Sequence, residues 1–476
     1  MIKIILSTIG AALSGLLLYL GHESIYFFLF APLCFTLICF IIEYNYTLAG
    51  FLYVSFFTFT YLFLQSTFLW DAADKDGFEV FYCIFPFLVY LIPQFILLFL
   101  HQYRIICFLI TWLLSEYIFY QMELGCPIYQ IGNIWGHVPV LIQWYEYTGI
   151  FGGSIWIMLI AFALYKAIHY QNYMRLLISI IFPISLGIIL YSTQNPKQGC
   201  TKTNKVSILS LRQDYDYNEI DSMIYANRYI YTDFIVMPEA LFACPENSYQ
   251  YSSLLTHLRR NLTDSLANTS IVMGLWLYDN NKNLYNVALS YSKKEEHIRY
   301  KQLRMPFAEF LPNSTILGYF NFFRQMVVYP LSTKSNPTEI LCVNQKTFSP
   351  LICYESICLD FLCKLIKNGA QFLTVSASNS SLNSMHMEKT VNNILRASAI
   401  TLRRDIIRSV DNGIPCFIKE NGDIYRIPVN TAHYAIRTVG INDKISFYVN
   451  NSKLISNIYL LGLLIFIVFF IIKDRI

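Results

Sequence analysis

Charged residues are scarce in this chain. Asp, Glu, Lys and Arg make up 14% of its 476 residues, whereas about a quarter is usual for soluble globular proteins. Hydrophobic residues make up 55% instead. This balance excludes an ordinary soluble protein and indicates a chain that lies partly within a membrane.

Several other signals are missing as well. The net charge of +4 is modest and no basic stripe runs through the sequence, which argues against a nucleic-acid partner. The spacing of Cys353, Cys358 and Cys363 matches no zinc pattern, so neither a metal nor another cofactor is expected. His297 lies in a charged turn and His386 in a polar loop, which argues against a Cys-His protease.

The apolar residues are concentrated in two parts of the chain. Residues 1–195 hold about seven runs long enough to cross a bilayer core of about 30 Å as helices, and one further run lies at 454–472. The segment 200–450 has the polar content and length of one sizeable globular domain. We therefore expect an α-helical membrane bundle of about eight spans that carries a globular domain. The expected spans are 4–20, 24–42, 47–69, 79–101, 104–122, 148–169, 174–191 and 454–472.

The short loops predict an orientation, because positive residues accumulate on the cytoplasmic side of membrane proteins. With the N-terminus inside, the inside loops carry the positive charge, and the outside loop at 70–77 is mostly acidic. The globular domain then faces outside. The positive residues concerned are Lys3, Arg104, Lys166, Arg175, Lys473 and Arg475.

Within 200–450, short runs rich in β-branched and aromatic residues alternate with helical patterns. This alternation predicts an α/β domain built as a layered sandwich. The expected helices are 218–228, 254–267, 359–367 and 387–404, and the expected strands include 206–210, 234–237, 270–274, 285–289, 298–301, 351–353, 372–375, 408–410 and 415–418.

Three chemically capable residues stand at the ends of expected strands. They are Glu239, Lys301 and Cys353, and in α/β sheets chemistry collects beyond strand ends. A free thiol is mostly protonated at neutral pH, so a nucleophilic cysteine needs a base or a nearby positive charge. Glu239 is placed to take the proton, and Lys301 to hold the thiolate and later an oxyanion. Each residue alone has an ordinary structural explanation, but their conjunction predicts nucleophilic catalysis.

The motifs around these residues resemble a known family. The globular segment resembles a domain of the nitrilase superfamily, whose signature is a Glu-Lys-Cys triad. The whole chain resembles the apolipoprotein N-acyltransferases of bacterial inner membranes, which combine several N-terminal spans, a periplasmic nitrilase-like domain and a final span. The matching stretches are 132–133, 143–149, 236–239, 284–286, 300–301, 305–312 and 352–355.

The resemblance implies a fold and a set of site residues. The fold would be an αββα sandwich, held outside the membrane. Glu239 would be the base, Lys301 the catalytic lysine and Cys353 the nucleophile. The accessory or substrate-binding residues would be Glu309, Glu355, Tyr285, Asn286, Tyr354 and Asn379.

The resemblance also implies an activity. An acyl chain would pass from a phospholipid, typically phosphatidylethanolamine, to a thioester on Cys353. It would then pass to the N-terminal diacylglyceryl-cysteine of a lipoprotein. The partners would thus be a phospholipid, a diacylated lipoprotein and the membrane. The protein would be a multi-pass protein of the bacterial inner membrane with its catalytic domain in the periplasm.

Two departures from the family pattern keep other functions open. The loop Ser378–Leu382 retains Asn379 but lacks the Asp and the aromatic residues common in the family, and Ala399 stands where an Arg-Ala-x-Glu motif has its glutamate. One alternative is a membrane-tethered amidase or hydrolase that uses the same triad with water as acceptor. Another is a non-catalytic relative that binds lipid or lipoprotein.

Overall fold

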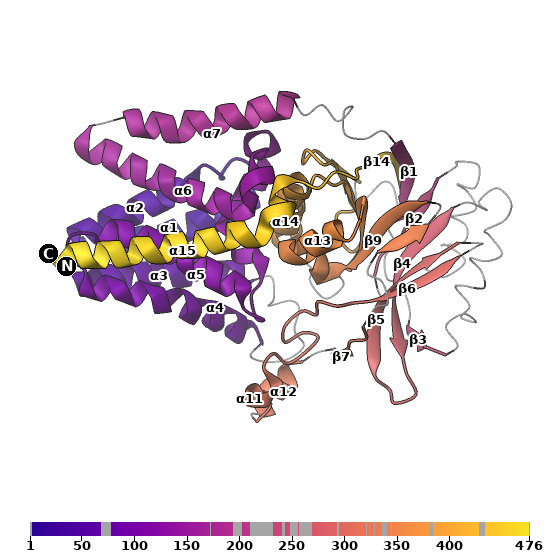
Figure 1. The fold of residues 1–476 in the computed structure, drawn as a ribbon. Helices are drawn as coiled ribbons and strands as arrows, with labels where there is room; N and C mark the ends of the chain where they lie inside the picture. The colour runs from indigo at the N-terminus through magenta and orange to yellow at the C-terminus, as the bar shows by residue number, and fades with distance from the viewer. Residues whose placement is uncertain are drawn as a thin grey trace. The chain divides into compact units, whose positions relative to one another are not determined.

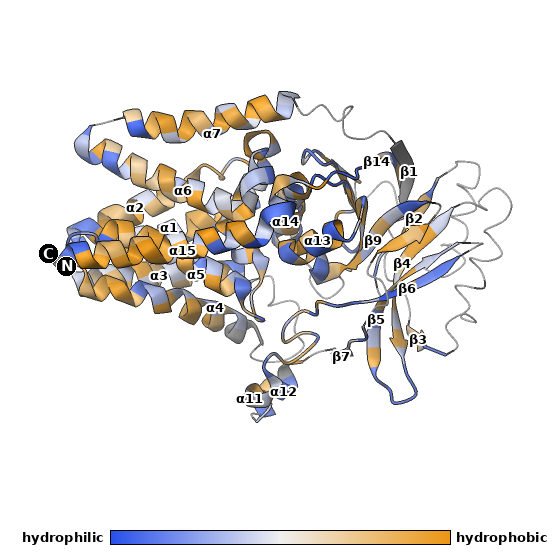
Figure 2. Ribbon diagram, viewed as in Figure 1, coloured by the Kyte–Doolittle hydropathy of each residue, from blue (hydrophilic) through white to orange (hydrophobic). Residues whose placement is uncertain are grey.

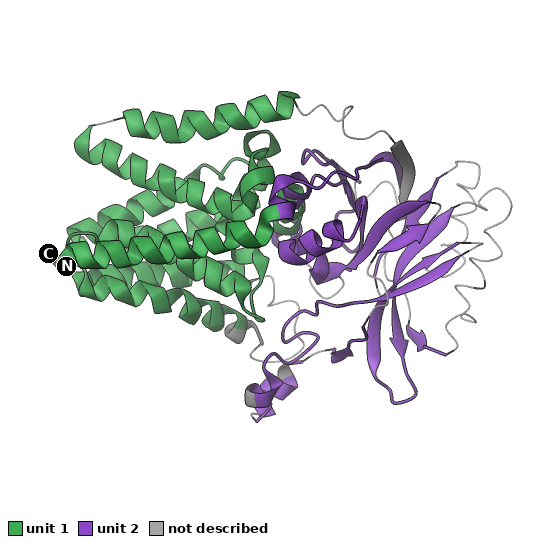
Figure 3. Cartoon of the chain, in the orientation of Figure 1, with its two compact units in different colours: residues 1–193, 389–397, 451–476 green, residues 194–388, 398–450 purple. Residues whose placement is uncertain are grey.

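The computed structural model divides into two compact units (Figure 3). Unit 1 comprises residues 1–193, 389–397 and 451–476, and unit 2 comprises residues 194–388 and 398–450. The residues that the structure describes are 2–67, 78–171, 173–193, 202–209, 232–239, 243–247, 256, 269–292, 295–319, 321–327, 329–335, 340–343, 345–379, 384–427 and 434–475.

Unit 1 is a helical bundle (Figure 1). Six of its described helices are long and apolar enough to cross a membrane, and α2 is a shorter apolar helix. Hydrophobic residues make up much of these helices, as the orange stretches of the ribbon in Figure 2 show. The protein is therefore a multi-pass membrane protein. The helices are α1 (Ile2–Glu23), α2 (Phe30–Tyr44), α3 (Thr47–Gln65), α4 (Phe78–Gln94), α5 (Arg104–Gln121), α6 (Tyr145–Tyr170), α7 (Met174–Thr193) and α15 (Phe447–Arg475).

Several helices differ in length from the expected spans, and the span expected at 24–42 is helical only from Phe30 to Tyr44. The run at 79–101 is α-helical only to Gln94 and continues as a 3₁₀ helix, η2 (Phe95–Phe99), which begins two residues after Pro93. Proline removes a helical hydrogen bond and clashes with the preceding turn. The final span begins seven residues earlier than expected, since α15 starts at Phe447. Its first turns are polar, and hydropathy alone does not detect them.

A buried segment without α-helix lies inside unit 1. It consists of the short 3₁₀ helices η3 (Pro127–Tyr129), η4 (Ile131–His137) and η5 (Pro139–Ile142). Buried irregular backbone must find its hydrogen bonds within the protein. Glu116, which is 2% exposed, accepts the Ile131 N–H at 3.2 Å. Ser154 accepts the Gly132 N–H at 2.9 Å and donates to Glu116.

Unit 2 contains two mixed β-sheets. The eight-stranded sheet has the order β14-β1-β2-β4-β5-β6, with β3 beside β4 and β7 beside β5, and the six-stranded sheet has the order β13-β12-β11-β10-β9-β8. The first sheet comprises β1 (Lys202–Leu209), β2 (Phe234–Val236), β3 (Ala243–Pro245), β4 (Ser270–Tyr278), β5 (Leu284–Tyr291), β6 (Glu296–Tyr300), β7 (Leu331–Ser332) and β14 (Tyr434–Ile441). The second comprises β8 (Leu341–Val343), β9 (Lys346–Ile352), β10 (Phe372–Ser378), β11 (Ile406–Asp411), β12 (Cys416–Ile418) and β13 (Ile424–Arg426).

The two sheets pack face to face. The Phe234 ring of the first sheet lies 5.1 Å from the Phe348 ring and 5.4 Å from the Phe372 ring of the second. The central strands read as apolar runs because both of their faces are buried, as parallel strands within a layered fold require. The aromatic cluster therefore forms the core between the layers.

Helices connect the parallel strands of the second sheet. Strand β9 leads through α13 (Leu359–Lys367) to β10, which leads through α14 (Met385–Leu402) to β11, and all three strands run parallel. The expected helix 387–404 ends two residues early, because Arg403 adopts φ +52° and breaks the helix. The expected helices 218–228 and 254–267 lie outside the described residues, apart from position 256. Unit 2 is thus the expected α/β sandwich.

Candidate active site

Strand β9 ends at Ile352 and delivers Cys353 into a sharp turn. Cys353 has φ +44° and begins the 3₁₀ helix η8 (Cys353–Ile357). A non-glycine residue in this left-handed region is strained unless its surroundings hold it there. The turn lifts the half-buried thiol out of the strand and leaves the sulfur facing the site.

Glu239 follows β2, and its carboxylate has defined donors. Oε1 accepts from Asn286 Nδ2 at 2.6 Å, and Oε2 accepts the Ser378 N–H at 3.1 Å. The carboxylate is 6% exposed. Strands β5 and β10 thereby hold the candidate base in one orientation.

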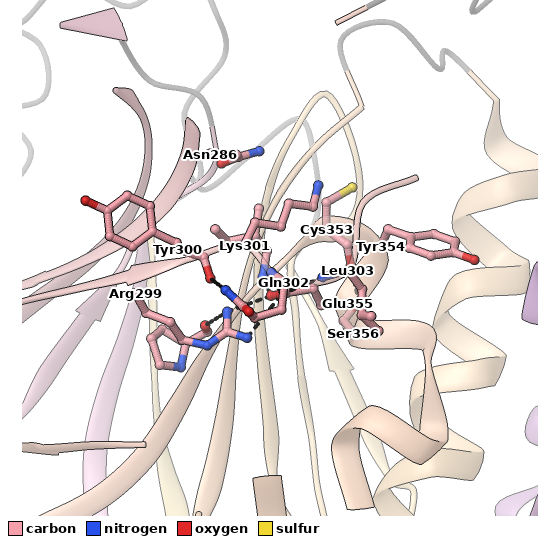
Figure 4. Close-up of polar contacts among 12 residues, drawn as sticks. Asn286, Arg299, Tyr300, Lys301, Gln302, Leu303, Cys353, Tyr354, Glu355 and Ser356 are labelled. Atoms are coloured by element: carbon pink, nitrogen blue, oxygen red, sulfur yellow. Dashed lines mark hydrogen bonds and ion pairs between the residues drawn. The ribbon is translucent and has the colours of Figure 1, made fainter. Parts of the chain in front are cut away.

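Lys301 follows β6 and lies between two carboxylates. Its Nζ donates to Glu309 Oε1 at 2.6 Å and stands 3.7 Å from Glu239 Oε1. Glu309 Oε2 also accepts the Met305 N–H at 2.7 Å, which ties the loop after β6 into the site. Figure 4 shows the Lys301 amine beside the Cys353 sulfur.

The electrostatics of this group keep the thiol protonated at rest. Burial, and next the charge of Glu239, raise the pKa of Cys353 to about 12, although Lys301 opposes the shift. Burial also raises the pKa of Glu239, with Lys301 acting against it. Burial alone would lower the pKa of Lys301, but Glu309 and Glu239 outweigh that effect and raise it. The lysine is therefore the fixed positive charge of the site.

Glu355 is completely buried and connects the two strand ends. It forms a bidentate ion pair with Arg299, at 2.7 Å to Nη1 and 3.0 Å to Nη2. It also accepts the backbone N–H of Gln302 at 2.7 Å and that of Ile352 at 3.0 Å. These contacts, drawn in Figure 4, hold the segments that carry Lys301 and Cys353. Glu355 positions the site and does not face the thiol.

Of the predicted accessory residues, Asn286 contacts Glu239, whereas Tyr285 and Tyr354 point elsewhere. Neighbouring residues of a strand point to opposite faces, so Asn286 reaches Glu239 while the Tyr285 hydroxyl donates to Asp279 at 3.2 Å. Tyr285 therefore lies on the far side of β5 from the reacting groups. Tyr354 points away from Lys301 in Figure 4.

Asn379 belongs to a second buried cluster that supports Glu239. Its backbone N–H donates to Asp411 Oδ1 at 2.8 Å and its side chain donates to Glu388. Glu388 also forms a buried bidentate ion pair with Arg408, at 2.8 Å to Nη1 and 2.7 Å to Nη2. Helix α14 lacks the family's glutamate at Ala399, yet it carries this buried carboxylate near its start. The cluster fixes the end of β10, where Ser378 N–H meets Glu239.

Sequence reasoning missed Arg299, Arg408, Glu388 and Asp411. A usable signal existed for Arg299, because residues two apart on a strand share a face and Arg299 lies two before Lys301. Both side chains are buried. The other three carried no local signal, since their partners are distant in the sequence.

Within the part of the chain that the structure describes, no cluster of His, Cys, Asp and Glu could hold a metal ion. The grouped side chains are a thiol, a fixed ammonium and carboxylates with defined donors. This arrangement can support nucleophilic attack by sulfur, with proton transfer to a carboxylate and stabilisation of an oxyanion.

Sequence comparisons point to one family. Its profile, described as "Apolipoprotein N-acyltransferase N-terminal domain", matches residues 14–163. Proteins named apolipoprotein N-acyltransferase match from Pasteurella multocida (27% identity, 40% of this chain and 38% of the relative), Vibrio parahaemolyticus (23%, 66% and 64%) and Rickettsia typhi (22%, 79% and 86%). The chain thus spans less than two thirds of the Pasteurella and Vibrio relatives.

Comparison with solved structures finds remote similarities that cover about half of the chain. An amidase of the nitrilase superfamily from Nesterenkonia has a TM-score of 0.39 at 14% identity, over 55% of this chain and 98% of the amidase. The NitFhit protein of C. elegans has a TM-score of 0.38 at 14% identity, over 55% of this chain and 65% of NitFhit.

We predict that Glu355→Gln destabilises unit 2 by about 3–5 kcal/mol, because it leaves the buried Arg299 guanidinium without its counter-charge. Thermal unfolding of the detergent-solubilised protein measures the loss. The control is Glu295→Gln, whose partner His297 is 3.5 Å away in a pair that is largely exposed, and which should change stability by less than about 0.5 kcal/mol. Equal melting temperatures for the two variants would contradict the role assigned to Glu355.

The second buried pair predicts a pH dependence of stability. Burial would raise the pKa of Glu388, but Arg408 outweighs it and lowers the pKa. The stabilisation is therefore complete above the ordinary glutamate pKa of about 4.3 and is lost as the pH falls through the lowered value. Glu388→Gln should lower the melting temperature strongly at pH 7 and less in acid.

The control for this titration is Glu420→Gln. Burial raises the pKa of Glu420, with Asp405 adding to the effect, so its ionised form is not a stabilising one. The gap in melting temperature between this variant and the wild type should not narrow as the pH falls. A Glu388→Gln gap that stays constant between pH 7 and pH 3 would rule out the ion pair as the cause.

Proposed function

We propose that this chain, which is similar to the apolipoprotein N-acyltransferases, acylates lipoproteins. It would transfer an acyl chain from a phospholipid, through a thioester on Cys353, to the N-terminal diacylglyceryl-cysteine of a lipoprotein. The observation that carries the proposal is the grouping of Glu239, Lys301 and Glu309 around the Cys353 thiol. The expected acyl donor is phosphatidylethanolamine.

In the first half-reaction, the Cys353 thiol gives its proton to Glu239 as the sulfur attacks the ester carbonyl. The charge that develops on the carbonyl oxygen is stabilised by the Lys301 ammonium, which Glu309 holds in position at 2.6 Å. When the carbon–oxygen bond breaks, the lysophospholipid alkoxide takes the proton from Glu239. A thioester remains on Cys353.

In the second half-reaction, the free α-amine of the lipoprotein attacks the thioester. It passes a proton to Glu239 and forms an amide. The departing thiolate recovers that proton, which restores the resting thiol. The burial that raises the pKa of Cys353 to about 12 makes this return favourable, so the enzyme ends each cycle in its protonated form.

The orientation proposed for the membrane places unit 2 in the periplasm of a bacterium and the termini in the cytoplasm. Positive residues at one end of the bundle support it. Lys3 begins α1, Arg104 begins α5, Lys166 lies near the end of α6 and Lys473 near the end of α15, and Figure 1 draws these helix ends beside both termini.

The first test is the intact mass of the purified protein after incubation with phosphatidylethanolamine. We expect the protein to gain the mass of one acyl group, and the Cys353→Ala variant to gain none. Adding a diacylated lipoprotein peptide should remove this mass from the protein, and the peptide should gain the same mass. Cys358→Ala is the matched control, because this half-buried cysteine lies five residues further on and should acylate normally. If the acyl group leaves the protein only by hydrolysis, the protein is a hydrolase. If no phospholipid acylates the protein, the non-catalytic binding protein is favoured.

We predict that Glu239→Gln slows acylation of Cys353 by about 10²–10⁴-fold, the usual contribution of a general base. In the wild type, acylation should fall as the pH drops through the pKa of Glu239, which burial raises, because the protonated carboxyl cannot accept the thiol proton. Single-turnover acylation measured against pH checks both points. Glu246→Gln is the control, since Glu246 pairs with Lys334 away from the thiol, and a comparable loss there would refute the assignment.

A further inference from the structure

A polar pocket lies at the end of the bundle that carries both termini. The loop from His101 to Arg104 forms one wall, and the ends of α6 and α15 form others, around a volume of about 390 Å³. All of its lining residues belong to unit 1. None of them belongs to the candidate active site.

Two cations in this pocket have unused hydrogen-bond donors. The Lys166 ammonium lies over the Tyr170 ring at 4.6 Å, with the rings of Phe162 and Tyr165 at 5.6 and 5.7 Å, and it has no hydrogen-bond partner among the described residues. Arg104 uses Nη1 for Asn45 O at 3.0 Å and Nε for His101 O at 3.3 Å. Within the described chain, its Nη2 has no such partner.

Among the described residues, the neighbouring acidic groups form no ion pair with these cations and are bonded elsewhere. Glu43 lies in the same pocket, but its Oε1 is 3.5 Å from His169 Nδ1. Asp474 accepts the backbone N–H groups of residues 101–103, at 2.9, 2.6 and 3.2 Å. The lining thus carries two cations, Lys166 and Arg104, and one carboxylate, Glu43.

An apolar groove adjoins the polar pocket. It runs between α5, α6 and α15, encloses about 300 Å³, and shares Ile106 and Phe162 with the pocket. Its lining from Ile106 to Leu113 covers two turns of α5, or roughly 10 Å. At the far end, the Tyr459 hydroxyl donates to Thr148 O at 2.9 Å.

The groove opens on the outer surface of the bundle. Leu159, Ile458 and Phe466 line it and are 55%, 56% and 55% exposed. Gly462 lies in its wall, and a Cβ added there would have no neighbour within 4 Å. Since α6 and α15 are long and apolar enough to cross a membrane, a bilayer around them would meet this opening, and the missing side chain at Gly462 makes room for a lipid chain there.

We propose that the pocket and the groove together bind one phospholipid molecule at the end of the bundle. Its phosphate would pair with Lys166 and the free nitrogen of Arg104, and one of its acyl chains would lie along the groove past Gly462. Charge complementarity favours this occupant over a neutral lipid, because basic pockets between spanning helices bind lipid head groups. A soluble anion would leave the adjoining groove empty.

Native mass spectrometry of the full-length protein tests the proposal, in a Cys353→Ser background that prevents acyl transfer. The probes are phosphatidylglycerol and a diacylglycerol with the same chains but no phosphate. We expect Lys166→Gln to weaken phosphatidylglycerol binding about fivefold, the usual effect of one basic residue near a lipid head group. Lys453→Gln, which removes an exposed lysine of α15 outside the pocket, should bind like the parent.

A second pair of variants tests the groove without touching a charge. Gly462→Trp fills it and should weaken phosphatidylglycerol binding by at least about fivefold. Leu461→Trp adds the same bulk at the neighbouring position, which is 58% exposed and lines neither cavity, and should bind normally. Diacylglycerol should bind the parent no better than phosphatidylglycerol binds Lys166→Gln. Unchanged binding in both Lys166→Gln and Gly462→Trp, or equal binding of the two probes, would overturn the proposal.

Discussion

The candidate site depends on one buried ion pair, between Arg299 and Glu355. Neither side chain is exposed, so the two charges attract in a medium of low dielectric constant and each would be costly without the other. The pair joins β6 of one sheet to the end of β9 in the other. Glu355 also accepts backbone N–H groups on both sides of the junction. A shared carboxylate therefore connects the backbone segments that carry Lys301 and Cys353.

Around this fixed junction, the charges leave the thiol neutral until a substrate arrives. Lys301 already balances Glu309 at 2.6 Å and faces Glu239 at 3.7 Å, so a thiolate would add a third negative charge to a buried group with one cation. In the proposed reaction, attack on an ester would place the new charge on an oxygen that Lys301 can stabilise. Electrostatic stabilisation that acts only in the transition state is the kind that accelerates a reaction.

Local sequence signals were enough to predict the spans and to select the candidate triad, whereas residues that depend on non-local contacts could not be predicted. The apolar runs of the bundle and the strand ends at Glu239, Lys301 and Cys353 can be read within windows of a few residues. Arg299 and Glu355 are 56 residues apart and Arg408 and Glu388 are 20 apart, so neither pair leaves a local pattern. The position of Tyr285, in contrast, could have been predicted locally, because adjacent residues of a strand face opposite sides and Tyr285 precedes Asn286.

In unit 1, too, a buried glutamate accepts a backbone N–H group in irregular structure. Glu116 accepts the Ile131 N–H and the Ser154 hydroxyl where regular helix gives way to irregular backbone, just as Glu355 accepts amides where strands end. An unpaired buried amide costs free energy comparable to a lost hydrogen bond, and one carboxylate can satisfy several amides at once. In a chain with so few charged residues, these two buried carboxylates hold backbone in place at points where secondary structure cannot. That role explains their burial without assigning either of them to the chemistry.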